Sequence, residues 1–267
     1  MADEPGFQLT ETAADRYEHY VAPIMAPFVT AILDAVDLSP GATVLDLACG
    51  TGFAARAAAT QAGPTGRVFG ADINEPMLKV ATAHHPRHYP DIEFTAAPAD
   101  ELPYPDASFD AVVCQQAAQF FPDLDAALTE TARVTRPQGR FAATVWAPTA
   151  LTSPYMAAQH EIIKEYGGQQ AADSFAAAFA CTADRLTTAL RTAGFHDAKA
   201  HELTFGIALP PLDEFAPGHL SVLPWAQQIL DSDGPDALTE AGRALVTRLT
   251  PHAPTFTFTA TLATATR

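Results

Sequence analysis

Hydrophobic and polar positions along the first half of the chain follow two alternating spacings. Short apolar runs are followed by segments whose apolar positions recur every three to four residues, with Gly- or Pro-containing turns between them. The runs predict strands over residues 42–47, 67–71, 92–95, 109–114 and 139–146, and the helical spacing predicts helices over 53–61, 75–84 and 124–135. Because strands alternate with helices, we expect a parallel sheet covered on both faces.

The second half of the chain is less regular, but its pattern predicts a return to the sheet. Residues 199–206 resemble a strand, and residues 255–262 alternate with the period of two that is typical of strands. Helical spacing is found over 155–166, 182–193 and 210–252. We expect the last of these segments to form a cap over the carboxyl edge of the sheet, where open α/β sheets bind ligands.

A helical pattern also precedes the first strand. Apolar residues from Asp15 to Val36 recur at helical spacing, and Pro23 and Pro27 interrupt them. Because proline removes a backbone donor and clashes with the preceding turn, this segment is expected to form two helices or one kinked helix.

Charge and composition limit the classes of function. The chain has 267 residues, with 15 Lys and Arg against 31 Asp and Glu, and a net charge of −16 would repel nucleic acid. The acidic N-terminus does not resemble a signal peptide, and no apolar stretch approaches the length of a membrane span, so we expect a cytoplasmic protein without a membrane partner. Cys49, Cys114 and Cys181 lie too far apart to suggest a disulfide framework or a zinc site.

The loop after the first predicted strand carries the strongest local signal. Asp46 to Gly52 reads Asp-Leu-Ala-Cys-Gly-Thr-Gly at a strand-to-helix turn, where glycine allows a ligand to approach the backbone. About 20 residues later, Asp72 ends the next strand, in a position suited to accept hydrogen bonds from ribose hydroxyls. A plain turn is the alternative explanation.

A dinucleotide site competes with this interpretation, because residues 50–55 also satisfy the loose G-x-G-x-x-G/A pattern. Asp46 argues against it: a pyrophosphate does not favour a neighbouring anion, whereas an ammonium group does. Ala99 and Asp100, after the third predicted strand, supply a partner for an adenine amino group. The terminal hairpin strand is also a feature that dehydrogenase domains usually lack.

Six segments between Thr10 and Trp146 carry a family resemblance. They are Val44–Gly52, Gly70–Leu78, Ala97–Tyr104, Ser108–Gln116, Phe120–Asp123 and Arg133–Arg140. Together they resemble the class I S-adenosylmethionine-dependent methyltransferases, in particular the small-molecule branch that includes ubiquinone and menaquinone biosynthesis enzymes. The resemblance covers about half of the chain. Ala48 departs from it, since many relatives have glycine there.

This resemblance implies an α/β fold with a Rossmann-like, mostly parallel sheet, a C-terminal antiparallel strand and a helical cap. It also implies S-adenosylmethionine as the cofactor. By the same resemblance, Ala48, Gly50 and Gly52 would contact the methionine part of the cofactor, and Asp72 would contact its ribose. Ile73 and Met77 would flank the adenine, Asp100 would bind the adenine amino group, and Glu101 would lie beside Asp100. The Gln115 backbone would bind the ammonium group, and Gln116 and Phe120 would lie near the sulfonium. The N-terminal helix would bring Tyr17 and Tyr20 to the cofactor, although packing of an amphipathic helix explains both tyrosines equally well.

We therefore expect one methyltransferase domain over residues 1–267. It would comprise N-terminal lid helices in 1–38, a cofactor-binding core in 39–150, and cap segments in 151–181 and 210–252. The apolar cap residues could line the pocket of an apolar or aromatic acceptor, or form the core of the cap itself. They are Phe175, Phe179, Phe215, Leu220, Leu223 and Trp225.

Methyl transfer from a sulfonium to a small-molecule acceptor is an in-line displacement, so alignment and exclusion of water are the main tasks of the protein. Relatives that deprotonate their acceptor often have histidine between the fourth strand and its Pro-Asp, but residues 115–121 contain no titratable group. No catalytic base is assigned: His19, His160 and His219 are candidates, and an acidic or nucleophilic acceptor needs none.

Three further expectations concern metals, alternative functions and assembly. In residues 84–88, Pro86 separates the histidines, so we expect a solvated helix end and no metal site. The alternative functions are an S-adenosylmethionine-binding protein without methyl transfer and an NAD(P)-dependent oxidoreductase. A homodimer is compatible with the sequence.

Overall fold

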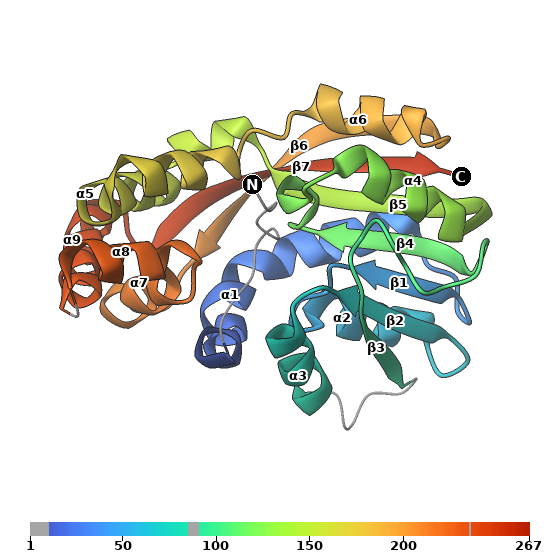
Figure 1. Ribbon diagram of the computed structural model, residues 1–267, viewed down its shortest axis with the longest axis horizontal. Coiled ribbons are helices and arrows are strands. Elements are labelled where there is room, and N and C mark those ends of the chain that lie inside the picture. Colours follow the sequence, from blue (N-terminus) through green and yellow to red (C-terminus); the bar gives the residue numbers. More distant parts are fainter. Residues whose placement is uncertain (1–10, 85–90, 235) are drawn as a thin grey trace.

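The computed structural model describes residues 11–84, 91–234 and 236–267, and its central feature is one mixed sheet (Figure 1). The described strands are ordered β3-β2-β1-β4-β5-β7-β6. Only β7 runs antiparallel to its neighbours β5 and β6, and the other pairs are parallel. The bounds are β1 Thr43–Leu47, β2 Arg67–Asp72, β3 Ile92–Ala96, β4 Phe109–Gln115, β5 Thr135–Trp146, β6 His196–Ala208 and β7 Thr255–Thr266. The predicted α/β class and mostly parallel sheet are confirmed.

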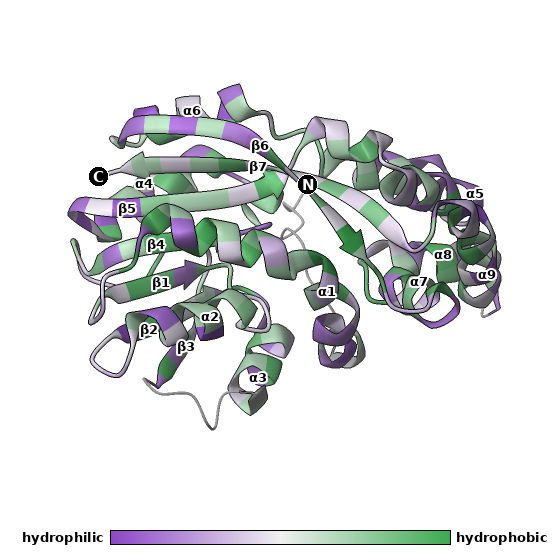
Figure 2. Cartoon of the chain, turned by 180° about the vertical axis from the view of Figure 1, so that it is seen from behind, coloured by the Kyte–Doolittle hydropathy of each residue, from purple (hydrophilic) through white to green (hydrophobic). Residues whose placement is uncertain are grey.

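Helices cover both faces of this sheet because each contributes one apolar side. Helices α1 (Glu11–Val36) and α2 (Phe53–Ala62) share a core with one face, and Figure 2 shows both on that side. Helices α4 (Leu124–Val134) and α6 (Ala183–Thr192) share a core with the other face. Helix α3 (Glu75–His84) packs against the beginning of α1 through Met77 and Val80.

Three strands are longer than their patterns predict. β5 begins at Thr135, β6 extends from His196 to Ala208, and β7 continues to Thr266. The extra length of β6 and β7 comes from pairing: β7 pairs with β5 from Ala260 to Thr266 and with β6 along nearly its whole length. The extra residues of β5 begin at Thr135, which pairs with Phe109 of β4. The alternation of residues within one segment does not predict the length of a strand, because a strand ends where pairing with its neighbour ends.

The N-terminal segment forms a single helix, so the alternative of two helices is wrong. Pro23 and Pro27 both lie inside α1. The apolar face of the helix, which includes Ile24, Phe28 and Ile32, is fully buried. We attribute the continuity of the helix to this burial, because apolar contacts worth about 1.5–3 kcal/mol per side chain offset the backbone hydrogen bonds lost at proline.

Helix α1 also corrects one expectation about membranes. Over Ala13–Val36 it is long and apolar enough to pass a test for a membrane-spanning helix that uses length and composition alone. The sequence therefore does contain such a stretch. In this structure its inward face packs against the sheet, as the core helix of a globular domain does.

A helical cap lies beyond the carboxyl ends of the parallel strands (Figure 1). It consists of α5 (Pro154–Ala177), which is interrupted at Gly168 where φ is 83°, together with α7 (Leu212–Ser221), α8 (Trp225–Asp233) and α9 (Ala237–Leu249). The last three helices lie between β6 and β7, as the pattern of residues 210–252 predicts. The cap shares one apolar core with part of α1 and with the first half of β7.

Candidate active site

A cavity of about 410 Å³ lies at the carboxyl ends of the strands, where the sheet, α1 and the cap meet. We call its wall from residues 17–127 the core half, and its wall from residues 146–225 the cap half. The core half contains the glycine loop after β1 and the ends of β2 and β4. The cap half consists of Trp146, Met156, Gln159, Phe175, Ala178, Phe179, His219, Leu223 and Trp225.

The glycine loop adopts a left-handed backbone at alternate positions. The φ angles of Ala48, Gly50 and Gly52 are 55°, 54° and 76°. Glycine takes this conformation without strain, and a residue with a Cβ atom costs about 1–2 kcal/mol there. Ala48, the one departure from the family pattern, therefore lies at a position that favours glycine on backbone grounds.

The two glycines of the loop differ in their surroundings. Gly50 lines the cavity, and a Cβ atom added there would have only Met77 nearby, at 3.8 Å. Gly52 lies outside the cavity lining, and its added Cβ would approach Phe94 Cζ to 2.8 Å. Gly52 is thus required for packing of α2 against β3, and the structure does not bring it to the cavity.

Asp72, at the end of β2, holds the glycine loop. Its Oδ2 accepts a hydrogen bond from the Gly50 N–H at 2.7 Å, and its Oδ1 accepts one from the Asn74 N–H at 2.8 Å. Burial raises the pKa of the Asp72 carboxyl, and these backbone donors partly oppose the increase. The carboxylate lines the cavity beside Ile73 and Met77, as the family pattern implies.

Asp46 is the most deeply buried acid of the site. Its residue is 1% exposed, and neither carboxyl oxygen has a hydrogen-bond partner among the described residues. Burial raises its pKa to about 8, the nearby Ala55 backbone N–H and the charge of Arg56 partly oppose the increase, and the charge of Asp72 adds to it. A buried carboxyl without partners is costly unless a ligand supplies a donor or a cation.

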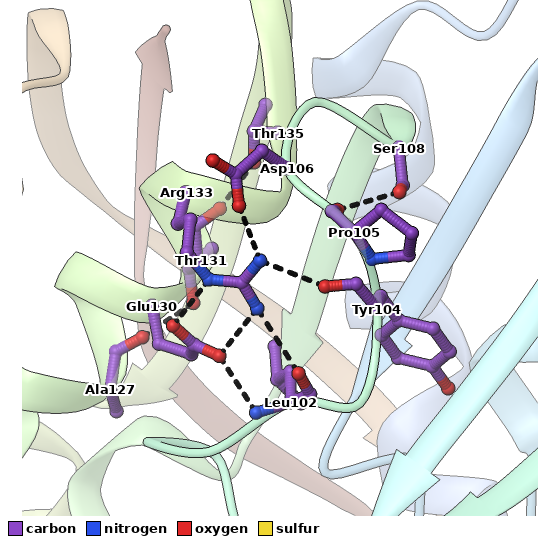
Figure 3. Close-up of polar contacts among 10 residues, drawn as sticks. All are labelled: Leu102, Tyr104, Pro105, Asp106, Ser108, Ala127, Glu130, Thr131, Arg133 and Thr135. Carbon is purple, nitrogen blue, oxygen red and sulfur yellow. Dashed lines mark hydrogen bonds and ion pairs between the residues drawn. The ribbon is translucent and has the colours of Figure 1, made fainter.

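The loop after β3 brings Ala99 and Asp100 to the cavity, whereas Glu101 lies outside the lining and is exposed. Arg133 of α4 holds the following part of this loop (Figure 3). Its guanidinium donates to the Leu102 carbonyl at 3.1 Å, to the Tyr104 carbonyl at 2.8 Å and to Asp106 at 2.7 Å.

Glu130 completes this arrangement. Its two carboxylate oxygens accept from Arg133 at 2.7 and 2.8 Å, and Oε1 also accepts from the Leu102 N–H at 2.8 Å. The Arg133 motif recognised in the sequence therefore acts on the loop that carries Asp100, although neither Arg133 nor Glu130 lines the cavity.

The end of β4 contributes Gln115, Gln116 and, after a turn, Phe120, all of which line the cavity. Gln116 has a left-handed backbone with φ of 52°, and its N–H donates to the Thr144 carbonyl at 2.9 Å. Its side-chain amide is buried without a partner among the described residues. Backbone strain combined with an unpaired buried amide is typical of a ligand-binding position.

Helix α1 borders the cavity through Tyr17, but Tyr20 points elsewhere. Tyr17 lines the core half, and burial together with the charge of Asp72 raises its pKa. Tyr20 packs against the cap, with its ring centroid 6.3 Å from that of Phe215. The two tyrosines thus differ in position: Tyr17 lines the cavity, and Tyr20 is a packing residue.

An ion pair connects α1 to the glycine loop. Glu18 lines the cavity and pairs with Arg56 of α2. The Arg56 guanidinium also donates to the Thr51 carbonyl at 2.7 Å. Sequence reasoning missed Glu18, because the contact joins residues 38 positions apart and leaves no local pattern.

The apolar cap residues divide between the two roles considered. Phe175, Phe179, Leu223 and Trp225 line the cavity. Phe215 and Leu220 are buried in the core shared by the cap and α1 and do not line it. Sequence reasoning also missed Trp146, Met156 and Gln159. The polar Gln159 between apolar positions of α5 is the one signal that could have found the last of these.

The three histidine candidates lie in different environments. His19 is exposed, with its ring against Tyr20. His160 stacks against Phe175 and does not line the cavity. His219 lines the cavity, is 4% exposed, and burial lowers its pKa to about 3. Of the three candidates, only His219 lines the cavity.

No group of metal-ligating side chains is found within the described ranges, and the three cysteines are free thiols. Cys49 and Cys114 are buried, and Cys181 is half-buried. In the histidine-rich segment of residues 84–88, residues 85–88 lie outside the described residues.

Comparisons with known proteins agree with this geometry. A methyltransferase domain model matches residues 45–143. The ubiquinone/menaquinone biosynthesis C-methyltransferase UbiE of Burkholderia orbicola is 31% identical over 182 residues, covering 64% of this chain and 74% of that protein. The chain therefore belongs to the class I S-adenosylmethionine-dependent methyltransferases of the small-molecule branch. An NAD(P)-dependent oxidoreductase is not favoured.

Two other similarities show how far this family likeness extends. Nocamycin O-methyltransferase of Saccharothrix syringae is 37% identical over 119 residues, but the match spans 44% of this chain and only 42% of that protein. A solved structure of phosphoethanolamine N-methyltransferase 2 of Haemonchus contortus with S-adenosyl-L-methionine has a TM-score of 0.64 and 19% identity, over 97% of this chain and 57% of that chain. The latter likeness shows the shared fold.

Proposed function

We propose that the protein transfers the methyl group of S-adenosylmethionine to a small apolar acceptor, with the cofactor in the core half of the cavity and the acceptor in the cap half. The observation that carries the proposal is the unpaired carboxyl of Asp46, buried beside the glycine loop in the same cavity as Asp72. A cofactor with an ammonium group and ribose hydroxyls suits these two acids.

The remaining residues of the core half fit the other parts of that cofactor. Ile73 and Met77 would flank the adenine, and Asp100 would accept from its amino group. Gln115, Gln116, Phe120 and Tyr17 would surround the region near the sulfur. Among the Asp, Glu, Lys and Arg side chains of the described residues, those that line the cavity are Glu18, Asp46, Asp72, Asp100 and Asp123, all acidic, which favours a cationic ligand.

The cofactor supplies a methyl group bonded to positively charged sulfur, so the protein has mainly to align and to exclude water. Helix α1 contributes to exclusion because it borders the cavity through Tyr17, Val21 and Met25. Its Glu18 contact to Arg56 ties it to the glycine loop. Alignment of the acceptor falls to the apolar cap half.

The apolar side chains of the cap half support an apolar acceptor. Phe175, Phe179, Trp146 and Trp225 provide aromatic surface, and the ring centroids of Trp146 and Phe179 are 6.2 Å apart in a stacked orientation. Such walls bind flat apolar molecules through burial of about 25 cal/mol for each Å² removed from water.

Incubation with S-adenosylmethionine labelled in its methyl group tests the function. We expect calorimetry to show binding, and S-adenosylhomocysteine to form only with a suitable acceptor, such as an alkylphenol or a naphthol. Binding without product across such acceptors would favour the alternative of a binding protein that does not transfer methyl groups. An absence of binding would contradict the whole proposal.

We also propose a cytoplasmic location, and the homodimer that the sequence is compatible with is open to a direct test. The test of the location is fractionation of the source cells. The test of assembly is light scattering of the purified protein, for which a dimer has about twice the mass of 28.3 kDa.

A further inference from the structure

Two polar side chains interrupt the apolar cap half of the cavity: Gln159 of α5 and His219 of α7. Gln159 is fully buried, and His219 is 4% exposed. Polar groups buried this deeply are retained when they have partners, because each unpaired one costs about 1–3 kcal/mol.

The two side chains bind each other, but not completely. Gln159 Nε2 lies 2.8 Å from His219 Nδ1, and the Tyr155 hydroxyl lies 3.1 Å from the same nitrogen. Gln159 Oε1 is buried with no hydrogen-bond partner among the described residues. One strong acceptor, on a side chain that lines the cavity, thus has no protein partner among the described residues.

These contacts also define the state of His219. Because the Gln159 Nε2 amide group can only donate, Nδ1 is the accepting nitrogen, and the neutral ring carries its proton on Nε2. His219 therefore donates a hydrogen bond to a ligand more readily than it removes a proton. Its ring is held between Phe215, in a stacked orientation, and Tyr155.

The charges around the cavity limit what can bind near these groups. No Lys or Arg lines the cavity within the described part of the chain, so the protein itself offers no counter-charge to a carboxylate or phosphate. The acidic side chains belong to the core half and are not found in the cap half. A cation bound in the cap half would therefore have no acidic side chain of the cap half as its counter-charge.

We propose that the cap half selects an uncharged acceptor with a hydroxyl or carbonyl group on its apolar body, and that Gln159 and His219 are the specificity-determining residues. Gln159 Oε1 would accept from a hydroxyl of the acceptor, and His219 Nε2–H would donate to its oxygen. The inference rests on the proposed function, because it places the cofactor in the core half.

Binding to the protein loaded with S-adenosylhomocysteine tests the selection by charge. The probes are two matched sets: 4-propylphenol with 4-propylbenzoate, and 2-naphthol with 2-naphthoate and 2-naphthylmethylammonium. At pH 7 we expect at least one of the phenols to bind at least tenfold more tightly than its charged counterparts. Equal or tighter binding of a charged probe, or no binding of either phenol, overturns the inference. Loading with S-adenosylhomocysteine is measured first, and its failure counts against the proposed function instead.

Three variants test the two residues. Gln159→Leu and His219→Phe should each weaken phenol binding about tenfold, the loss expected for one hydrogen bond, with the affinity for S-adenosylhomocysteine unchanged. Gln170→Leu, at an exposed glutamine of the same helix, is the matched control and should change neither affinity. If Gln159→Leu and Gln170→Leu bind phenols equally, Gln159 has no part in selection. Circular dichroism shows whether each variant is folded.

Discussion

The Asp72 carboxylate accepts a hydrogen bond from the Gly50 backbone N–H at 2.7 Å, which joins the end of β2 to the glycine loop after β1. The same carboxylate accepts from Asn74 on its other oxygen. The acid that is proposed to bind the ribose therefore also shapes the loop that is proposed to face the methionine part. Loss of this carboxylate should affect both contacts at once.

Asp72→Asn leaves one accepting oxygen where two backbone donors need partners. Hydrogen bonds to charged groups contribute about 1.5–3 kcal/mol, so we expect S-adenosylmethionine to bind about 10- to 100-fold more weakly. Isothermal titration calorimetry measures the change. Asp100→Asn is the comparison, because Asp100 lines the same cavity but is exposed, and its loss should cost less. Unchanged affinity in Asp72→Asn would contradict the proposed role.

Asp46 should make cofactor binding depend on pH. Its pKa of about 8 keeps the carboxyl protonated in the free protein at neutral pH, and a neighbouring ammonium favours the ionised form. Affinity for S-adenosylmethionine should therefore rise by about tenfold or more between pH 6 and pH 8, and Asp46→Asn should flatten this dependence. A wild-type affinity independent of pH argues against the role of Asp46.

The same group affects stability with a defined sign. A carboxyl whose pKa is raised in the folded state contributes stability that is fully present below its ordinary pKa of about 4 and is lost as the pH rises through about 8. Urea unfolding of the protein without cofactor should therefore show wild type losing stability across this range relative to Asp46→Asn. The opposite slope would count against burial as the cause of the shift.

The two loop glycines should respond differently to alanine. Gly52→Ala places a Cβ atom 2.8 Å from Phe94 Cζ in a left-handed backbone, and we expect a loss of about 2–4 kcal/mol in the free energy of unfolding. Gly50→Ala meets only Met77, at 3.8 Å, and should cost about 1 kcal/mol but weaken cofactor binding, because Gly50 lines the cavity. Urea titrations and calorimetry of both variants measure the contrast, and equal losses of stability would refute it.

Arg133 should act on the cofactor from outside the cavity. Arg133→Met removes the donors to the Leu102 and Tyr104 carbonyls, so we expect a loss of about 1–3 kcal/mol in stability and weaker cofactor binding through the loop that carries Asp100. Arg185→Met is the control: it removes an exposed ion pair with Asp125, which should matter little. If both variants bind the cofactor like wild type, Arg133 is structural only.

Much of the core half of the cavity was predictable from short segments of sequence. A strand, a glycine turn and an acid at the end of the next strand are local patterns, and parallel pairing of β1 with β2 brings Asp46 and Asp72 to one sheet edge. These patterns predicted Asp46, Asp72 and Asp100, whereas the family resemblance implied Ile73, Met77, Gln115, Gln116 and Phe120, which also line the cavity. Gly52 and Glu101 were predicted as contacts but do not line the cavity, because proximity along the chain does not decide which way a residue faces.

By itself, the sequence determined the order of strands and helices along the chain. It also determined the position of the glycine loop and of the acids beside it, since periodicity and turn chemistry act over a few residues. Only the tertiary structure decided that α1 is one helix, that Arg133 holds the Asp100 loop, and that Gln159 meets His219 across 60 residues. Those outcomes depend on contacts between side chains distant in sequence, which burial and hydrogen bonding select only once the sheet and the cap have come together.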